Sequence, residues 1–305
     1  MVIKLVILGS GGTVPTLSRN LPAMAIQCDG LLFLFDCGEG TQLQLMRARL
    51  SMGKLECICI SHLHGDHVTG LPGLLMTLGQ IPRERPLLIC GPPGITEYTE
   101  GTRRLLGFQY QYPVEMLETS GGVVYQEGPL RIEAAPAEHS CFTLAYALIE
   151  AERPGRFLIE EAERLGIPAG PLYGRLQSGQ AVTLPDGRTV QPSAVMGPPR
   201  RGRKIVYATD TRPAERVIQF ARGADVLIHD GMFDDDLKDQ AQMKWHSTVV
   251  QAAQVARQAQ AGRLLLTHLS SRYYADAPLA EQARQVFPAT TVARDLMEID
   301  VPMYK

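Results

Sequence analysis

The sequence predicts a layered α/β fold with a cluster of histidines and carboxylates at its strand ends. Short apolar runs typical of strands alternate with stretches of helical spacing along most of the 305 residues. The segment His62-Leu63-His64-Gly65-Asp66-His67 carries three of the seven histidines within six residues. Residues 153–204, rich in Gly, Pro and charge, interrupt the alternation as a functional insertion or a linker would. Length alone allows one large domain or two smaller ones.

The predicted elements follow from the period of the apolar residues. Strands are short runs of apolar residues, and helices are longer runs with an apolar stripe. Ser247 or Thr248 is a plausible N-cap for one helix because each precedes an apolar periodic stretch. The predicted strands are residues 2–8, 31–35, 57–60, 86–90, 130–134, 204–208, 225–228 and 263–267. The predicted helices are residues 41–49, 71–78, 94–106, 213–222, 247–260 and 278–287.

The composition is that of an ordinary globular protein. The hydrophobic fraction is 45%, the charged fraction is 20%, and the net charge of −2 excludes a uniformly basic nucleic-acid binder. No apolar run approaches the length of a membrane span, and the first residues resemble a strand more than a signal peptide. The six cysteines are scattered without a C-x-x-C pair, so we expect buried thiols in a reducing, cytoplasmic compartment and no cysteine-based zinc site.

Residues 153–204 are predicted to form a protruding arm. They contain a helical stretch at 158–165 and a hairpin pattern at 181–190, with Pro185-Asp186-Gly187 at its turn. Residues 186–204 carry five basic residues against Asp186, a surplus of four (five minus one), which suits an RNA backbone. On charge alone a solvated linker explains this surplus equally well. The helical stretch is acidic, with Glu160, Glu161 and Glu163, so the arm as a whole is not a basic surface.

The histidine-rich segment points to a metal site. Side chains in extended backbone alternate between faces, so His62, His64 and Asp66 can converge, with His67 at the start of the next helix. Imidazole and carboxylate are ligands that suit zinc and similar metals, whereas the simplest alternative is a polar loop rich in histidine. Four more polar residues each end an apolar run: His139, Asp210, His229 and His268. Each alone is more often a structural residue, but together they indicate a shared crevice at the strand ends.

These residues resemble the metallo-β-lactamase superfamily and, within it, the ribonuclease Z family of tRNA 3′-processing endonucleases. The resemblance rests on H-x-H-x-D-H together with motifs spread over nearly the whole chain. These are Leu8-Gly9-Ser10-Gly11-Gly12 leading to Arg19-Asn20, Phe35-Asp36-Cys37-Gly38-Glu39-Gly40-Thr41-Gln42, His64-Gly65-Asp66-His67-Val68-Thr69-Gly70-Leu71-Pro72-Gly73-Leu74, Asp210-Thr211-Arg212, His246-Ser247-Thr248 and Thr267-His268-Leu269-Ser270-Ser271-Arg272-Tyr273. Ile167-Pro168-Ala169-Gly170-Pro171 and Leu176-Gln177-Ser178-Gly179 look like that family's flexible arm.

The resemblance implies an architecture and a metal centre. The fold would be a four-layer αβ/βα sandwich, one domain over residues 1–305, with residues 153–204 as a tRNA-binding arm. Each subunit would hold two zinc ions, although manganese or iron accept the same ligands. His62, His64 and His139 would hold one ion, Asp66, His67 and His268 the other, and Asp210 would bridge them.

The resemblance also implies a reaction. A metal-bound hydroxide, oriented by Asp66, would attack the phosphodiester of a precursor tRNA, leaving a 3′-hydroxyl on the tRNA and a 5′-phosphate on the trailer. His246 would act as general acid, although its alternative is a mere neighbour of a helix cap. Asp230 would support His246 where the family usually has glutamate in His-Glu-Ala-Thr; this chain has His229-Asp230-Gly231-Met232, with a shorter acid and a looser backbone. A second departure is Thr209, where glycine is common.

Substrate contacts and assembly complete the expectations. Arg19 and Asn20 would read the cleavage position, Arg272 and Tyr273 would touch a phosphate, and Gly170 and Pro171 belong to the arm; the subunits would form a homodimer. The alternatives are a general zinc phosphodiesterase or sulfatase, a thiol-ester or lactone hydrolase, and a non-catalytic RNA-binding scaffold.

Overall fold

The chain forms two compact units, each with its own apolar core. The structure is a computed structural model that describes residues 2–303. The larger unit comprises the chain up to Ile149 together with Arg203–Pro302, and the smaller unit is built on Glu150–Gly202. Throughout the described part of the chain, every helix is too short or too polar to cross a membrane.

The first sheet of the larger unit is antiparallel at one side and parallel at the other. Among the described residues it has seven strands, and β18, β1, β3 and β4 pair antiparallel while β4 to β7 pair parallel. In spatial order the strands are β18 (Glu298–Val301), β1 (Ile3–Gly9), β3 (Ala23–Cys28), β4 (Leu31–Phe35), β5 (Leu55–Cys59), β6 (Leu87–Gly91) and β7 (Val114–Glu118).

The second sheet repeats this mixed arrangement. It too has seven strands over residues 2–303; β17, β15, β14 and β13 are parallel, β10 is antiparallel to β13, and β8 is antiparallel to β9. In spatial order the strands are β17 (Thr290–Val292), β15 (Leu264–Thr267), β14 (Val226–Asp230), β13 (Lys204–Ala208), β10 (Phe142–Glu150), β9 (Leu130–Glu138) and β8 (Gly122–Glu127). Two short strands, β2 (Gly11–Gly12) and β16 (Leu269–Ser270), pair separately.

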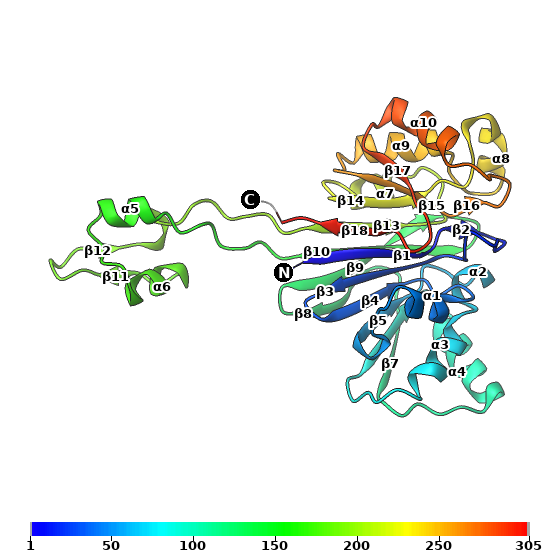
Figure 1. The fold of residues 1–305 in the computed structure, drawn as a ribbon, viewed down its shortest axis with the longest axis horizontal. Coiled ribbons are helices and arrows are strands. Elements are labelled where there is room, and N and C mark those ends of the chain that lie inside the picture. Colours follow the sequence, from blue (N-terminus) through cyan, green and yellow to red (C-terminus); the bar gives the residue numbers. More distant parts are fainter. Residues whose placement is uncertain (1, 304–305) are drawn as a thin grey trace. The chain divides into compact units, whose positions relative to one another are not determined.

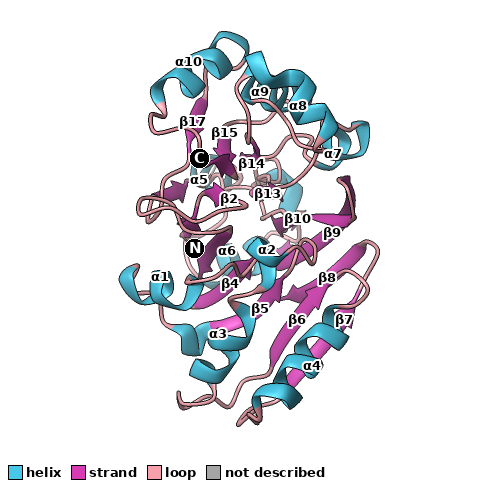
Figure 2. Cartoon of the chain, turned by 90° about the vertical axis from the view of Figure 1, so that its right-hand side faces the viewer, coloured by secondary structure: helices cyan, strands magenta, loops and turns pink. Residues whose placement is uncertain are grey.

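Helices cover the outer face of each sheet, so the larger unit has four layers (Figures 1 and 2). On the first sheet lie α1 (Thr41–Arg47), α3 (Leu71–Leu78) and α4 (Ile95–Leu106), and on the second lie α7 (Glu215–Phe220), α9 (Val249–Gln258) and α10 (Ala277–Val286). A third apolar cluster, which includes Phe33, Phe35 and Tyr146, fills the space between the sheets. The expected αβ/βα sandwich is confirmed. Two further short helices of this unit are α2 (Gly65–Val68) and α8 (Lys238–Met243).

Two central strands, β3 and β10, are not predicted from the sequence, and each case has a physical reason. Strand β3 reads Ala-Met-Ala-Ile-Gln-Cys, and its small residues have little intrinsic strand preference. Strand β10 contains a continuous apolar run from Leu144 to Leu148, which fits a buried strand or a buried helix equally well. Pairing partners decide both cases: Tyr146 of β10, for example, lies opposite Tyr207 of β13.

The smaller unit contains two helices and a two-stranded hairpin among its described residues. Its helices are α5 (Ile159–Arg164) and α6 (Pro171–Gln177), and its hairpin pairs β11 (Val182–Thr183) with β12 (Thr189–Val190). Gly187 takes a φ of 84° at the hairpin turn, a conformation that glycine adopts without a steric penalty. Small and branched side chains form its core: Ala162, Ile167, Leu176, Val182, Leu184, Val190 and Val195. At its base the two chain segments pair antiparallel, Arg153 with Arg200.

Candidate metal centre and active site

The metal-ligand candidates converge because each follows a strand of one of the facing sheets. His62, His64, Asp66 and His67 follow β5, and His139 directly follows β9. Asp210 follows β13 of the second sheet, and His268 follows β15, which is separated from β13 by β14. Parallel strands end at the same edge of a sheet, so side chains far apart in sequence meet there.

Three imidazoles and one carboxylate oxygen form a first group. His62 Nε2 lies 3.0 Å from His64 Nδ1, and His139 Nε2 lies 3.3 Å from the same atom. Oδ2 of Asp210 lies 3.7 Å from His62 Nε2 and 3.8 Å from His139 Nε2. In a tetrahedral zinc site with bonds of about 2.0–2.2 Å, ligand atoms lie about 3.3–3.6 Å apart, so this group fits a divalent cation.

Two imidazoles and two carboxylates form a second group beside the first. Asp66 Oδ2 lies 3.6 Å from His67 Nε2 and 3.3 Å from His268 Nε2. Asp210 Oδ1 lies 3.2 Å from each of these imidazole nitrogens. Asp210 therefore turns one carboxylate oxygen to each group, the arrangement that a bridging ligand requires. His67 Nε2 is buried and makes no hydrogen bond, as expected for a nitrogen that binds a cation instead.

A glycine makes room for the second group. A Cβ at Gly12 would lie 2.5 Å from atoms of the His268 ring, closer than real Cβ contacts. The short β2–β16 pairing brings Gly12 against this histidine, with Gly12 opposite Ser270. Gly12, the last residue of the motif Gly-Ser-Gly-Gly, thus leaves the space that the His268 ring occupies.

A buried carboxylate beneath the site orients His67. Asp36 directly follows β4, and its Oδ2 lies 2.7 Å from His67 Nδ1. The same carboxylate accepts hydrogen bonds from the Tyr207 hydroxyl (3.0 Å) and from the Ser61 hydroxyl (2.9 Å). A carboxylate that holds the outer nitrogen of a ligand imidazole is a common second layer of metal sites, since it fixes the ring and its tautomer.

The protonation states of the site suit a cation. Burial and the neighbouring imidazoles lower the pKa of His62 well below its usual value. Burial alone would raise the pKa of Asp210, but the imidazoles of His268 and His67 lower it well below that of a free aspartate. Burial opposes a charge on His67, yet the carboxylates of Asp210 and Asp36 raise its pKa well above normal. The buried anions thus attract positive charge to the place where a metal would sit.

A second histidine–carboxylate pair borders the metal-ligand groups. His246 Nδ1 lies 2.7 Å from Oδ2 of Asp230, the last residue of β14. Burial lowers the pKa of His246, but the charge of Asp230 and its hydrogen bond outweigh burial and raise the pKa to about 9. The His246 ring lies 4.9 Å from the His139 ring and stacks on that of His268, at 5.2 Å between centroids. An imidazole whose pKa is raised by a carboxylate is therefore held beside the metal-ligand groups.

These side chains open into one cavity of about 740 Å³. Its wall includes residues from both groups, from the loop before α9 and from the segments after β2 and β14, namely Thr13, His64, Asp66, His139, Asp210, Met232, Trp245 and His246. The backbone amide of Thr13 donates a 2.7 Å hydrogen bond to Asp66 Oδ2, which fixes that carboxylate at the cavity wall. The cavity can therefore present a phosphodiester to the metal-ligand groups and to His246 together.

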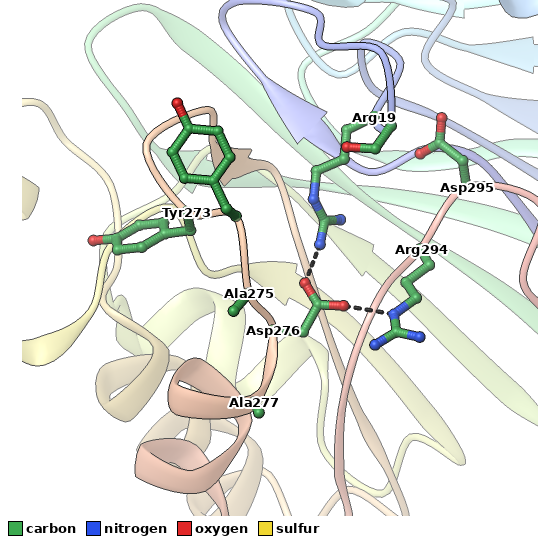
Figure 3. A pocket seen from close by; sticks show the side chains of 9 residues that line it. Arg19, Tyr273, Ala275, Asp276, Ala277, Arg294 and Asp295 are labelled. Atoms are coloured by element: carbon green, nitrogen blue, oxygen red, sulfur yellow. Dashed lines mark hydrogen bonds and ion pairs between the residues drawn. The ribbon is translucent and has the colours of Figure 1, made fainter.

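Arg19 lies in a neighbouring hollow of about 590 Å³ and is engaged within the protein (Figure 3). Its guanidinium donates to Ser10 Oγ and to the Ala293 carbonyl, each at 2.7 Å, and forms an ion pair with Asp276. Arg294 contacts the other oxygen of Asp276 at 2.5 Å. Because its hydrogen-bonding groups are used in this way, Arg19 braces the loop that carries Asn20.

The other predicted substrate residues are also held by local contacts. The backbone amide of Asn20 donates to Asp295 at 2.7 Å, and the Tyr273 hydroxyl accepts from the Asp234 amide at 2.9 Å. Arg272 lies over the Phe233 ring, 5.1 Å from its centroid. Gly170 and Pro171 lie in the smaller unit, where they begin α6.

The buried cysteines form a separate cluster between the sheets. The thiols of Cys57, Cys59 and Cys90 lie 3.4–3.9 Å from one another. Cys57 and Cys59 share a strand face, and the neighbouring strand β6 supplies Cys90. All three belong to the apolar core, with aromatic rings and aliphatic side chains around them, so the cluster is part of the packing.

Three residues of the site had no assigned role in the sequence analysis. Asp36 carried the same signal as Asp210, a carboxylate directly after an apolar strand. Tyr207 lies inside a predicted strand, and nothing in the sequence shows that its hydroxyl reaches Asp36. Trp245 is the only tryptophan, and its carbonyl accepts a 3.0 Å hydrogen bond from His139 Nδ1. The prediction that His229 shares the crevice with His139, Asp210 and His268 is wrong: His229 is buried inside β14, where its Nδ1 bonds the carbonyl of Asp230.

The chain is similar to proteins named Ribonuclease Z or tRNase Z over nearly its whole length. Two proteins named Ribonuclease Z, from Methanosarcina acetivorans and Salinibacter ruber, are 45% and 44% identical to it over 302 and 306 residues, which cover 99% of this chain and 99% and 95% of theirs. The crystal structure of human tRNase Z, short form, matches with a TM-score of 0.73 at 26% identity, covering 98% of this chain and 100% of that one.

Broader matches agree on the fold. A profile of the Beta-lactamase superfamily domain matches residues 177–269, and one described as Anti-Pycsar protein Apyc1 matches residues 3–97. The metallo-beta-lactamase fold protein YhfI from Bacillus subtilis superposes with a TM-score of 0.70 at 19% identity, covering 99% of this chain and all of that one, so it supports the fold alone.

Proposed function

The chain belongs to the ribonuclease Z family of metallo-β-lactamase-fold proteins, and we propose that it is a metal-dependent endoribonuclease that removes the 3′ trailer of precursor tRNA. One observation carries the proposal beyond family membership. Seven ligand-type side chains, which follow four strands, form two groups joined by the two oxygens of Asp210. Two-metal sites of this kind catalyse in-line displacement at phosphorus in many nucleases and phosphatases.

The residues that would hold the metals are those the resemblance names. His62, His64 and His139 would hold one zinc ion and Asp66, His67 and His268 the other, with Asp210 shared between them. Manganese and iron accept the same ligands. Two such cations would neutralise the charge on the phosphodiester and make nearby water more acidic. Neutral His62 and ionised Asp210 are the forms that bind metal, which supports this assignment.

Three protein side chains, those of Asp66, His246 and Asp230, would then orient the attacking water and supply a proton to the leaving group. Asp66, fixed by the Thr13 amide, would orient the attacking water. His246, kept protonated by Asp230, would give its proton to the leaving 3′-oxygen of the tRNA. The products would be a tRNA with a 3′-hydroxyl and a trailer with a 5′-phosphate. Asp230 reaches His246 at 2.7 Å although it is one methylene shorter than the glutamate usual in the family, so its shorter side chain suffices for the contact.

The smaller unit, which contains most of the predicted arm at residues 153–204, would bind the body of the tRNA. Its support is a core of its own, which makes it a folded element, and the basic surplus near its second chain segment. Gly170 and Pro171, at the start of α6, would form part of that contact surface. The enzyme would act as a homodimer in the cytoplasm, and reduced thiols such as those of Cys57, Cys59 and Cys90 suit a reducing compartment.

Each of the predicted substrate residues near the cavity would have a specific role. Arg19 would act by positioning the loop 13–20, since its guanidinium is engaged with Ser10, Ala293 and Asp276. Asn20 would read the cleavage position from that loop. Arg272 and Tyr273, which follow His268, would contact a phosphate of the substrate.

The proposal is tested by cleavage of a 5′-labelled precursor tRNA with purified protein, with and without chelator, beside an Asp66→Ala variant. We expect a single cut near the discriminator base that disappears with chelation and with the substitution. An intact precursor together with rapid hydrolysis of a small aryl phosphodiester would instead identify a general phosphodiesterase of the same fold.

Action of the arm across a dimer has its own test. A subunit that lacks the arm keeps its metal centre, and an Asp66→Ala subunit keeps its arm. If the arm serves the partner's site, a mixture of the two restores cleavage that neither shows alone. Mixtures that form dimers and stay inactive would contradict the dimeric arrangement.

A further inference from the structure

The single tryptophan of the chain lies in the wall of the catalytic cavity. Trp245 lines it together with Met243, Lys244 and His246, and the residue remains 37% exposed. A large, partly exposed indole is a costly feature at a polar site, because apolar surface is normally removed from water. The exposed part of the indole offers a flat apolar surface to a ligand in the cavity.

The cationic side chain of Arg212 lies against the indole of Trp245. The guanidinium carbon of Arg212 lies 4.0 Å from the centroid of the Trp245 ring, which places the flat guanidinium over one face. Arg212 is itself fixed, since its Nε donates to Glu138 Oε2 at 2.9 Å and its amide donates to the Glu138 carbonyl at 2.9 Å. The indole and guanidinium are thus ordered before any ligand arrives.

The backbone fixes the indole next to the chemistry. Trp245 has a φ of 61°, and its carbonyl accepts a 3.0 Å hydrogen bond from His139 Nδ1. The following residue is His246, held by Asp230. Anything that stacks on Trp245 would lie one residue from the proposed proton donor and beside the metal-ligand groups.

We propose that Trp245 and Arg212 form a stacking platform for an unpaired RNA base next to the scissile phosphate. This inference rests on the proposed function, because it names a subsite of the same cavity. Bases stack on aromatic side chains whatever their sequence, and arginine adds a cation–π contribution as well as attraction for phosphate. Proteins that recognise RNA ends bind splayed, single-stranded bases in this way. The platform would therefore hold the trailer and discriminator region without selecting a sequence.

Intrinsic fluorescence tests binding directly, because all tryptophan emission comes from Trp245. The metal-loaded protein is titrated with a short single-stranded oligoadenylate and, in parallel, with inorganic phosphate. We expect saturable quenching by the oligonucleotide and none by phosphate, since only the former carries bases. Emission that the oligonucleotide leaves unchanged would overturn the proposal.

Kinetics separate stacking from a structural role. Trp245→Leu should lower kcat/KM for precursor tRNA about tenfold, mainly through KM, because stacking on one aromatic residue contributes roughly that factor. Hydrolysis of a small phosphodiester, which has no base to stack, should lose less activity than precursor cleavage does, and Trp245→Phe should restore most of the RNA cleavage. An equal loss on both substrates would overturn the platform and show that the indole only supports the backbone that holds His139.

Failure of this inference is distinguishable from failure of the proposed function. If the native protein leaves precursor tRNA intact but the oligonucleotide still quenches Trp245, the platform stands and the tRNA substrate is wrong. If the native protein cleaves precursor tRNA and Trp245→Leu cleaves it at the same rate, the function stands and the platform is wrong.

Discussion

Replacing Asp230 with asparagine should slow the reaction at alkaline pH and leave its rate at acidic pH almost unchanged. Asp230 is fully buried and its Oδ2 lies 2.7 Å from His246 Nδ1. Its two oxygens also accept hydrogen bonds from the backbone amides of Thr211, Met232 and Ser247. Asparagine keeps the shape and one acceptor oxygen but removes the charge that keeps the His246 imidazole protonated.

The size of the effect follows from the pKa of His246, which is raised to about 9. An opposite charge in contact shifts a pKa by roughly 1–3 units, so loss of Asp230 should bring the value to about 7. A general acid works only while protonated, so the rate falls as the pH rises through its pKa. At pH 8 the protonated fraction would drop about tenfold, whereas at pH 6 it would change by only about 10%.

The assay is the pH profile of kcat for precursor tRNA between about pH 5.5 and 9.5, for the native protein and Asp230→Asn. We expect the alkaline limb of the variant to move about 2 pH units toward acid. An unchanged limb would refute the assignment of His246 as proton donor. Metal content is measured in parallel, together with Asp230→Ala, which should lower turnover without releasing metal. Zinc loss in that variant would show that Asp230 supports the fold of the site instead.

Three other perturbations test the site and the smaller unit. Residues 154–199 can be replaced with a short Gly-Ser turn, because Arg153 and Arg200 on either side already pair. This variant should lose precursor cleavage and keep hydrolysis of a small phosphodiester. Equal loss of both activities would show that the smaller unit has only a structural role. Asp36→Asn should weaken metal binding about 10–100-fold, measured by competition with a chelating dye, and unaltered affinity would contradict its role in orienting His67. Gly12→Ala places a Cβ 2.5 Å from His268, so bound metal should fall from two ions toward one; two retained ions would show that the loop can yield.

Much of the site could be predicted from the sequence because its signals are local. His62, His64, Asp66 and His67 occur within six residues, directly after an apolar strand, and strand geometry brings them to one place. The four-layer fold followed from the resemblance, since strand and helix periodicity alone establishes only a layered α/β protein. The Gly-Pro-rich interruption likewise marked the segment that folds as a separate unit.

The remaining features depend on contacts between distant segments. Nothing near Asp210 in sequence shows that its two oxygens face different groups of histidines, because this results from the pairing of β13 with β14 and of β14 with β15. The bond from His139 to the Trp245 carbonyl joins residues 106 positions apart. Periodicity reports which face of an element is buried, but it does not report which partner covers that face.

The backbone at the strand ends shows how the sheets present their side chains to a common centre. Asp36, Asp210 and His268 have φ values of 57°, 47° and 58°, a left-handed conformation that costs an ordinary residue roughly 1–2 kcal/mol. Each residue lies within two positions of the end of a strand, and Trp245, beside His246, shares the conformation at 61°. Glycine would remove this cost but would also remove the carboxylate or imidazole. The fold therefore accepts local strain at the positions where a strand must stop abruptly and turn a functional side chain into the cavity.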